Sequence, residues 1–124
     1  STPDVALTTP LHFKRIAARA MRQVLVEAAR RRSAEKRGGG APIVTFEDSL
    51  AQSPSTADEL LALDEALEQL ANVSPRQATM VESRFFAGLD IPETAELLGV
   101  SEATVLRDWR AAKAWLAHEL REPR

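Results

Sequence analysis

The chain has 124 residues, a formal net charge of −2 and 44% hydrophobic residues, a composition typical of one soluble globular domain or two very small ones. It contains no cysteine and only two histidines, His12 and His118, which excludes disulfides and cysteine-ligated metals and leads us to expect neither a metal site nor a cofactor. No apolar run approaches the roughly 18 residues of a membrane span, and no signal-peptide pattern opens the chain, so we expect a cytoplasmic protein with no membrane partner.

The charges are unevenly distributed along the chain. Residues 10–40 contain nine basic and two acidic residues, whereas residues 41–74 contain seven acidic residues and no basic one. Segments of opposite charge suggest different tasks and different partners. The basic segment is suited to a nucleic acid or another anionic surface, and the acidic segment is not.

The basic segment has a helical pattern over about residues 11–36. Its apolar residues recur at spacings of three and four, which predicts one apolar stripe along an α-helix. This stripe consists of Phe13, Ile16, Ala17, Ala20, Met21, Val24, Leu25 and Ala28. Because the stripe is rich in alanine and contains no tryptophan, the sequence argues against a helix that lies on a membrane surface.

Residues 38–56 are predicted to form a flexible linker. Three consecutive glycines, Gly38–Gly40, are followed by Pro42 and several serines, a composition that breaks helices and favours loops. No Gly-Lys-Ser/Thr follows the glycines, so the segment is not a phosphate-binding loop. The linker would join a first unit, residues 1–37, to a second unit, residues 57–122.

Clear helix start signals follow the linker. Capping boxes, in which a serine, threonine or aspartate precedes a glutamate or glutamine by three residues, begin at Thr56, Ser74 and Asp90. Gly88 and Gly99 are predicted to end the second and third of these helices. The apolar faces of the first two helices carry Leu60, Leu63, Leu67, Leu70, Ala78, Met80, Val81 and Phe85. Since no segment shows sustained alternation of apolar and polar residues, the expected fold class is all-α.

Residues 91–98 and 101–120 are predicted to form a helix-turn-helix. Ala95 is small where the second helix crosses the first, and Gly99 can adopt the left-handed conformation of the turn. The angle between the helices would be filled by Leu98, Val100 and Val105. The second helix buries a stripe of Val105, Trp109, Ala112, Leu116 and Leu120. Its opposite face, with the first turns leading, could enter the major groove of DNA.

These residues lead to a resemblance. The string Ser-Glu-Ala-Thr-Val-Leu-Arg-Asp-Trp-Arg from Ser101, preceded by Ile-Pro-Glu-Thr-Ala-Glu-Leu-Leu-Gly-Val from Ile91, resembles domain four of bacterial sigma factors, most closely the extracytoplasmic-function (ECF) group. The basic helix over 11–36 is similar to the last helix of domain two in that group. The order of basic helix, acidic linker and helix-turn-helix fits as well.

The resemblance implies a four-helix sigma domain four that reads the −35 promoter element through its second helix-turn-helix helix. By position, Thr104, Leu106, Arg107 and Arg110 would face bases, and Ser101 and Lys113 would face phosphates. Glu102 belongs to the same outward face. Leu106 beside Arg107 could meet a thymine methyl group. Base contacts specify the sequence, and phosphate contacts position the protein.

The resemblance also implies core RNA polymerase as a partner, with an anti-sigma factor as a further candidate. A groove for the flap tip of the polymerase β subunit would be lined by Leu60, Leu63, Leu67, Phe85 and Phe86. The last helix of domain two would help to recognise and melt the −10 element. Its candidate contacts are Lys14, Arg15, Arg19 and Arg22.

The chain departs from the sigma pattern in two places. A complete domain two has several helices before the one that resembles residues 11–36, including its surface for the polymerase β′ clamp, so the chain is expected to be a fragment or a shortened form. The stripe from Phe13 to Ala28 would then pack on another chain as a homo-oligomer, pack on the chain's own domain four, or be mobile. Thr94 stands where sigma factors usually carry an aliphatic residue.

Alternatives remain for two features. An autonomous helix-turn-helix regulator that binds DNA as a dimer would use the same motif as a sigma factor. The acidic residues Asp58, Glu59, Asp64, Glu65 and Glu68 are expected to form a solvated helix face, the alternative being a docking surface for a basic partner. Since no candidate nucleophile, metal cluster or phosphate loop accompanies these carboxylates, we do not expect an enzyme.

Overall fold

The computed structural model describes residues 10–36 and 56–121, which form five helices and no strand. The predicted all-α fold is therefore confirmed. The predicted linker over 38–56 lies outside the described residues except at Thr56. The helices are α2 (Pro10–Lys36), α3 (Ala57–Val73), α4 (Pro75–Ala87), α5 (Ile91–Leu98) and α6 (Glu102–Arg121).

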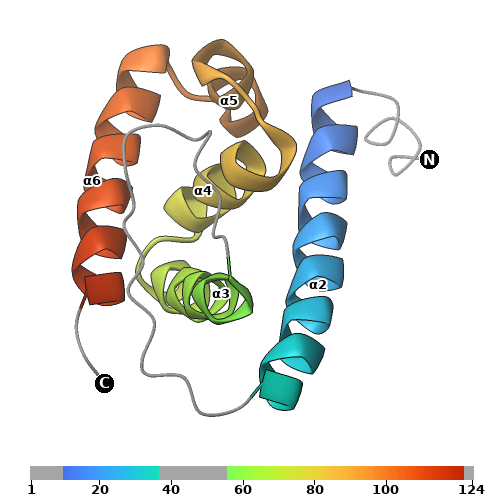
Figure 1. The fold of residues 1–124 in the computed structure, drawn as a ribbon. Helices are drawn as coiled ribbons and strands as arrows, with labels where there is room; N and C mark the ends of the chain where they lie inside the picture. The colour runs from blue at the N-terminus through green and yellow to red at the C-terminus, as the bar shows by residue number, and fades with distance from the viewer. Residues whose placement is uncertain (1–9, 37–55, 122–124) are drawn as a thin grey trace.

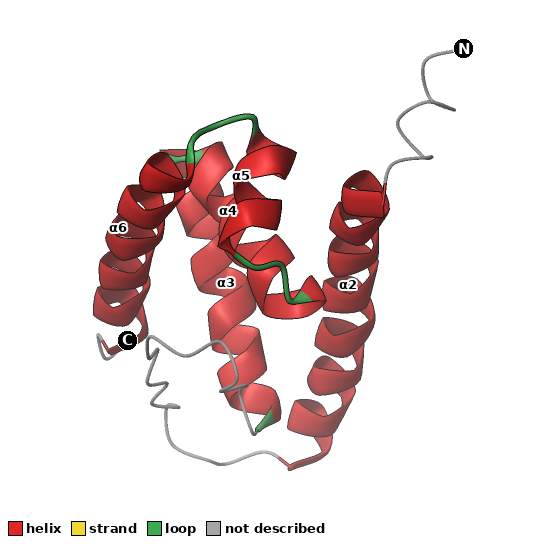
Figure 2. Cartoon of the chain, turned by 90° about the horizontal axis from the view of Figure 1, so that it is seen from above, coloured by secondary structure: helices red, strands yellow, loops and turns green. Residues whose placement is uncertain are grey.

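The helices are arranged around a central pair. In Figures 1 and 2, α3 and α4 lie between α2 on one side and α6 on the other. Helix α5 lies at one end of this pair, where it contacts α4, α6 and α2. Across the described parts of the chain, no helix is both long enough and apolar enough to span a bilayer.

The helix ends follow the predicted capping signals. At Thr56 and at Asp90 both halves of the capping box form: the side-chain oxygen of each residue accepts the backbone N–H three residues later, at 3.0 and 2.8 Å, and the glutamate there accepts the cap's own N–H. At Ser74 only one half of the box forms, because Ser74 Oγ accepts the Gln77 N–H at 3.3 Å without a return bond from the Gln77 side chain. Pro75 still opens α4, since the first turn of a helix needs no N–H at that position.

The core is built from the helical stripes that the sequence contains. On α3 the buried residues are Leu60, Leu63, Ala66, Leu67 and Leu70, and on α6 the predicted stripe of Val105, Trp109, Ala112, Leu116 and Leu120 is buried throughout. On α4, Ala78, Met80 and Val81 are buried as predicted. Phe85 packs against the core as predicted but is only partly buried, and the neighbouring Phe86, which it meets edge-on at 5.0 Å between centroids, is the buried ring.

Helix α2 contacts α3 and α4 through a different face from its apolar stripe. Its buried residues are Ala18, Val26 and Ala29. Phe13 is 62% exposed and Val24 66%, and Ile16, Met21 and Leu25 are exposed as well. Of the three alternatives for the stripe, packing on the chain's own C-terminal helices is therefore wrong, and the other two are not tested. The face that does pack there carries Arg22, which finds carboxylate partners on α3 and α4.

The burial of Leu67 gives a direct test of this core. Leu67 is 0% exposed, so Leu67→Ala removes buried surface and leaves a cavity, and we expect the free energy of unfolding to fall by about 2–5 kcal/mol in urea denaturation. Val73 on the same helix is 67% exposed, and Val73→Ala should change it by no more than about 0.5 kcal/mol. Similar losses for the two variants would contradict the assigned core.

Candidate nucleic-acid interface

The turn between α5 and α6 is fixed by backbone hydrogen bonds. Gly99 has φ 69° and ψ 34°, the left-handed conformation. Its N–H donates to the Glu96 carbonyl, and the Val100 N–H donates to the Ala95 carbonyl at 3.1 Å, which is the bonding pattern of a glycine-terminated helix. The Ser101 side chain then opens α6 by accepting the Thr104 N–H at 3.1 Å.

The inner side of this turn is apolar and closely packed. Ala95 and Val105 are buried, and Leu98 and Val100 are partly buried against the core. Thr94, the departure from the sigma pattern, is completely buried, and its hydroxyl donates to the Asp90 carbonyl at 2.7 Å. The threonine therefore occupies an apolar position with its one polar group satisfied.

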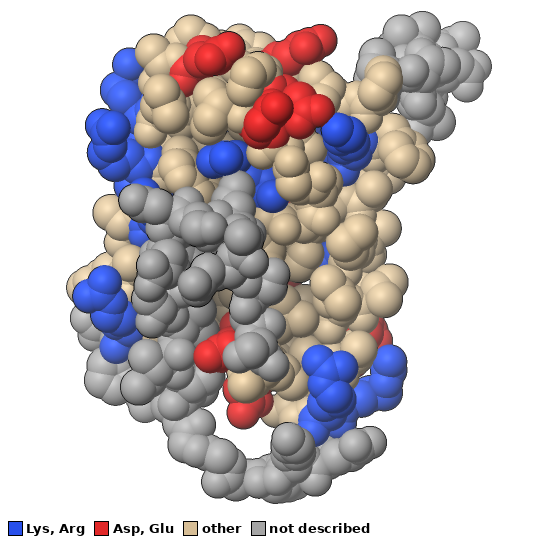
Figure 3. Space-filling model, turned by 45° about the horizontal axis from the view of Figure 1, so that its top comes forward, with Lys and Arg blue, Asp and Glu red and all other residues tan. Residues whose placement is uncertain are grey.

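The opposite side of α6 faces solvent. Leu106 is 48% exposed, and Ser101, Glu102, Arg107 and Arg110 are exposed. Thr104 and Lys113 are partly exposed. The residues on and next to α6 that are predicted to meet DNA thus lie outside the core, and Figure 3 shows basic side chains along the edge of the molecule that α6 forms.

A short hydrogen-bond chain orients Arg107 on this face. Thr104 Oγ1 accepts from Ser101 Oγ at 3.0 Å and from Arg107 Nη2 at 3.1 Å. Since Ser101 also caps the helix, these bonds tie the guanidinium of Arg107 to the first turn of α6. The first turns are the part of a recognition helix that meets base edges.

Two arginines of α4 attach α6 to the central pair. Arg76 Nε donates to Asp108 Oδ2 at 2.7 Å, and Asp108 is buried. Arg84 lies over the Trp109 ring with 4.6 Å to the centroid and also donates to the Leu89 carbonyl at 3.1 Å. Burial lowers the pKa of Arg84.

Sequence reasoning missed these attachments because they join residues far apart in the chain. The one available signal was Asp108 itself, an acidic residue next to Trp109 in the buried stripe, where a charge needs a partner. The two contacts act on neighbouring residues of α6, so they oppose rotation of the helix about its axis.

The structure separates the four basic residues of α2 that were predicted to contact the −10 region. Arg15 and Arg19 are exposed. Lys14 Nζ lies 2.8 Å from Glu93 Oε2 on α5. This lysine lowers the pKa of Glu93, and the Asp90 backbone N–H adds to the effect. Arg22 lies among carboxylates of α3 and α4, with its side chain 15% exposed.

The residues predicted to line a polymerase groove lie mostly in the core. Leu63 and Leu67 are almost completely inaccessible, Leu60 and Phe86 are buried, and Phe85 alone is partly exposed. In the described arrangement α2 and α6 lie on opposite sides of α3 and α4, and these leucines present no open surface.

The acidic residues of α3 do not form a uniformly solvated face. Asp64 accepts from Arg22 at 2.7 Å, Glu68 lies 3.9 Å from the same guanidinium, and Asp58 accepts from Ser33 Oγ at 2.6 Å. Glu65 is exposed. Asp64 pairs with the chain's own helix α2, whereas the Glu68 side chain is 72% exposed, and a docking surface for another basic partner stays a prediction.

Comparison with protein-family models identifies the class of protein that these features define. The model of the ECF sigma factor family matches residues 4–122. The chain therefore belongs to the ECF sigma factor family, whose members are transcription initiation factors. Searches of curated proteins and of solved structures found no match.

The turn between α5 and α6 provides the next test. A Cβ at Gly99 would meet no atom within 4 Å, so only the positive φ opposes a side chain there. We expect Gly99→Ala to lower the free energy of unfolding by about 1–2 kcal/mol, and Gly99→Asn to lower it less because asparagine tolerates this conformation. Urea denaturation measures both, and an alanine variant as stable as the parent chain would contradict the turn.

Proposed function

We propose that this chain is a promoter-recognition factor for core RNA polymerase, with α6 reading the −35 element. The observation that supports this most directly is the two-sided character of α6. Its apolar stripe is buried, and Arg107 and Arg110 point away from the core. A helix that exposes arginines and a leucine in its first turns has the chemistry needed to read base edges in the major groove.

In this proposal the roles on α6 divide by position. Thr104, Leu106, Arg107 and Arg110 contact base edges, and Glu102 lies on the same face. Ser101 and Lys113 lie near phosphates and set the register. Arg107, already oriented by Thr104, is the leading candidate for a bidentate contact to a guanine.

The remaining parts of the chain take the other sigma-factor tasks. Residues 1–37 correspond to the end of domain two, with Arg15, Arg19, Arg22 and Lys14 near the −10 element. Residues 57–122 correspond to domain four, joined by the linker over 38–56. The flap tip of the polymerase β subunit binds a groove lined by Leu60, Leu63, Leu67, Phe85 and Phe86. The buried leucines must first become accessible for this contact to form.

Capture of polymerase tests this function. The tagged full chain is incubated with purified core RNA polymerase, and we expect it to retain the polymerase and to support transcription from a cognate promoter. An autonomous regulator behaves differently: it binds a two-half-site DNA tightly by itself and retains no polymerase. That second result would overturn the proposal and identify the chain as an autonomous regulator.

Base reading by Arg107 is tested with a panel of promoters mutated one base pair at a time. Arg107→Ala should cost about 1–3 kcal/mol, concentrated at one position of the −35 element. Thr104→Val, which removes the hydroxyl that orients Arg107, should weaken the same position to a smaller extent.

Lys113→Ala is the matched control for this panel. It should weaken binding to all the sequences about equally and reduce the slope of log K against log salt by about one. An equal loss on every sequence for Arg107→Ala would assign Arg107 to a phosphate instead, and a base-selective loss for Lys113→Ala would reverse its role.

A further inference from the structure

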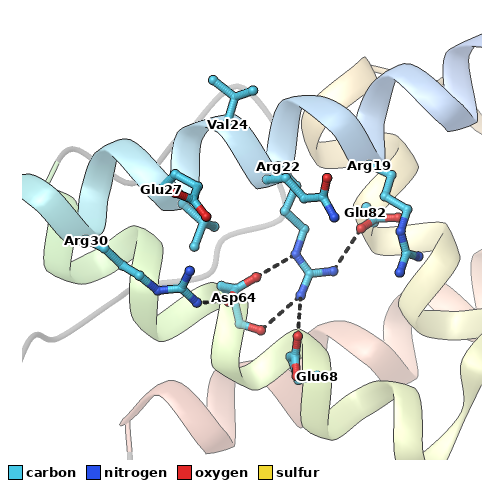
Figure 4. Close-up of a pocket in the computed structure, with 10 residues that line it drawn as sticks. Arg19, Arg22, Val24, Glu27, Arg30, Asp64, Glu68 and Glu82 are labelled. Carbon is cyan, nitrogen blue, oxygen red and sulfur yellow. Dashed lines mark hydrogen bonds and ion pairs between the residues drawn. The ribbon is translucent and has the colours of Figure 1, made fainter.

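Helix α2 is attached to the rest of the molecule through charged groups as well as through buried apolar residues. The Arg22 cluster, defined as Arg22, Asp64, Glu68 and Glu82, forms the centre of this contact (Figure 4). Arg22 Nε donates to Asp64 Oδ1 at 2.7 Å, Nη1 donates to Glu82 Oε2 at 2.8 Å, and Nη2 donates to the Asp64 carbonyl at 3.1 Å. One guanidinium thereby joins α2 to both helices of the central pair.

Further polar contacts extend along the length of α2. Near its start Lys14 pairs with Glu93 at 2.8 Å, and near its end Ser33 donates to Asp58 at 2.6 Å. Arg30 approaches Asp64 at 4.0 Å. These carboxylates belong to α3 and α5, so the contact unites the basic helix with acidic residues from distant parts of the chain.

The apolar part of the same contact is small. The buried apolar residues of α2 are Ala18, Val26 and Ala29, whereas its largest apolar side chains are exposed. Val24 points away from α3 and α4 in Figure 4. Because burial of apolar surface is the main source of stability in helix packing, and the largest apolar side chains of α2 are not buried here, we expect the Arg22 cluster to contribute to the attachment of α2.

Such an attachment is separable. Bringing charges out of water offsets much of the attraction between them. Here burial lowers the pKa of Arg22, but the hydrogen bonds that Arg22 donates to Glu82 and Asp64 outweigh this effect, so the pKa is raised. A groove of about 510 Å³ runs beside the cluster, lined by Arg19, Arg30, Glu27 and the cluster itself. Ions from solution can therefore reach these groups.

We propose that α2 is held in an autoinhibitory contact, in which carboxylates of α3, α4 and α5 occupy the basic residues that α2 would present to DNA. The inference rests on the proposed function. Of the four candidate −10 contacts, Arg22 and Lys14 are paired with the chain's own carboxylates. These pairs withhold Arg22 and Lys14 from DNA until α2 leaves, whereas Arg15 and Arg19 are already exposed.

Spin-label distances test the contact itself. The chain contains no cysteine, so labels can be placed at Ala20→Cys on α2 and Ala114→Cys on α6, both exposed positions. We expect one narrow distance distribution in the free chain, and a longer, broader one after Asp64→Asn with Glu82→Gln. Labels at Ala71→Cys and Ala114→Cys, on α3 and α6, should keep their distance and show that the rest of the fold persists.

Arg22→Gln disrupts the cluster from the other side and should lengthen the α2–α6 distance in the same way. The matched control is Glu65→Gln with Glu96→Gln, which removes the same two charges from exposed positions and should leave the distance unchanged. If both disruptions leave the α2–α6 distribution as narrow as in the parent chain, the Arg22 cluster does not hold α2 and the proposal is overturned.

DNA affinity tests the inhibition. The probe is a short mixed-sequence DNA duplex, measured by fluorescence anisotropy at several salt concentrations. Relative to the Glu65/Glu96 control, Asp64→Asn with Glu82→Gln should bind about tenfold more tightly, and its salt slope should steepen by about two as Arg22 and Lys14 become available. Adding Arg22→Gln to this double variant should remove about half of the increase in its salt slope.

The outcomes separate this proposal from the proposed function. The proposed inhibition is overturned if Asp64→Asn with Glu82→Gln binds DNA no more tightly than the Glu65/Glu96 control. It is also overturned if the gain in DNA affinity does not depend on Arg22. The spin-label distances need neither polymerase nor DNA. A chain that captures no polymerase but shows the expected distances would refute the proposed function and leave the contact between α2 and the central pair in place.

Discussion

The burial of one stripe on α6 is the constraint on which the remaining structure depends. Trp109, Ala112 and Leu116 recur at the helical period and lie against α3 and α4, so α6 has one permitted rotation about its axis. That rotation turns Arg107 and Arg110 outward, and the bond to Thr104 then orients the Arg107 guanidinium. Arg76 and Arg84 reinforce the rotation, because they hold the buried Asp108 and the Trp109 ring from the α4 side.

Much of the C-terminal half could be predicted because its signals are local. A cap such as Thr56 or a turn glycine such as Gly99 acts within a few residues of the chain. The helical spacing of leucines is likewise enough to predict that they are buried. Phe85 and Phe86 could not be told apart in this way, since two adjacent rings on α4 point in different directions and only tertiary packing selects one of them.

Helix α2 could not be oriented from its sequence because it has two faces with different possible partners. The apolar stripe that includes Phe13 and Val24 gave the stronger periodic signal, yet the face with Ala18 and Arg22 meets the rest of the described chain. Arg22 pairs with Asp64 and Glu82, which lie 42 and 60 positions further along the chain, so these pairs produce no periodic pattern in the sequence. Arg22 and Arg107 are the same residue type, and only their neighbours decide which of them faces solvent.

The aromatic residues of α6 give the protein an intrinsic optical reporter. The chain has two tryptophans and no tyrosine, and both tryptophans, Trp109 and Trp115, lie on this one helix. Ultraviolet emission excited at the red edge of the absorption band therefore originates from α6 alone. Because a cation lies over one of the two indoles, a shift in emission wavelength records a change in the surroundings of α6 without any added dye.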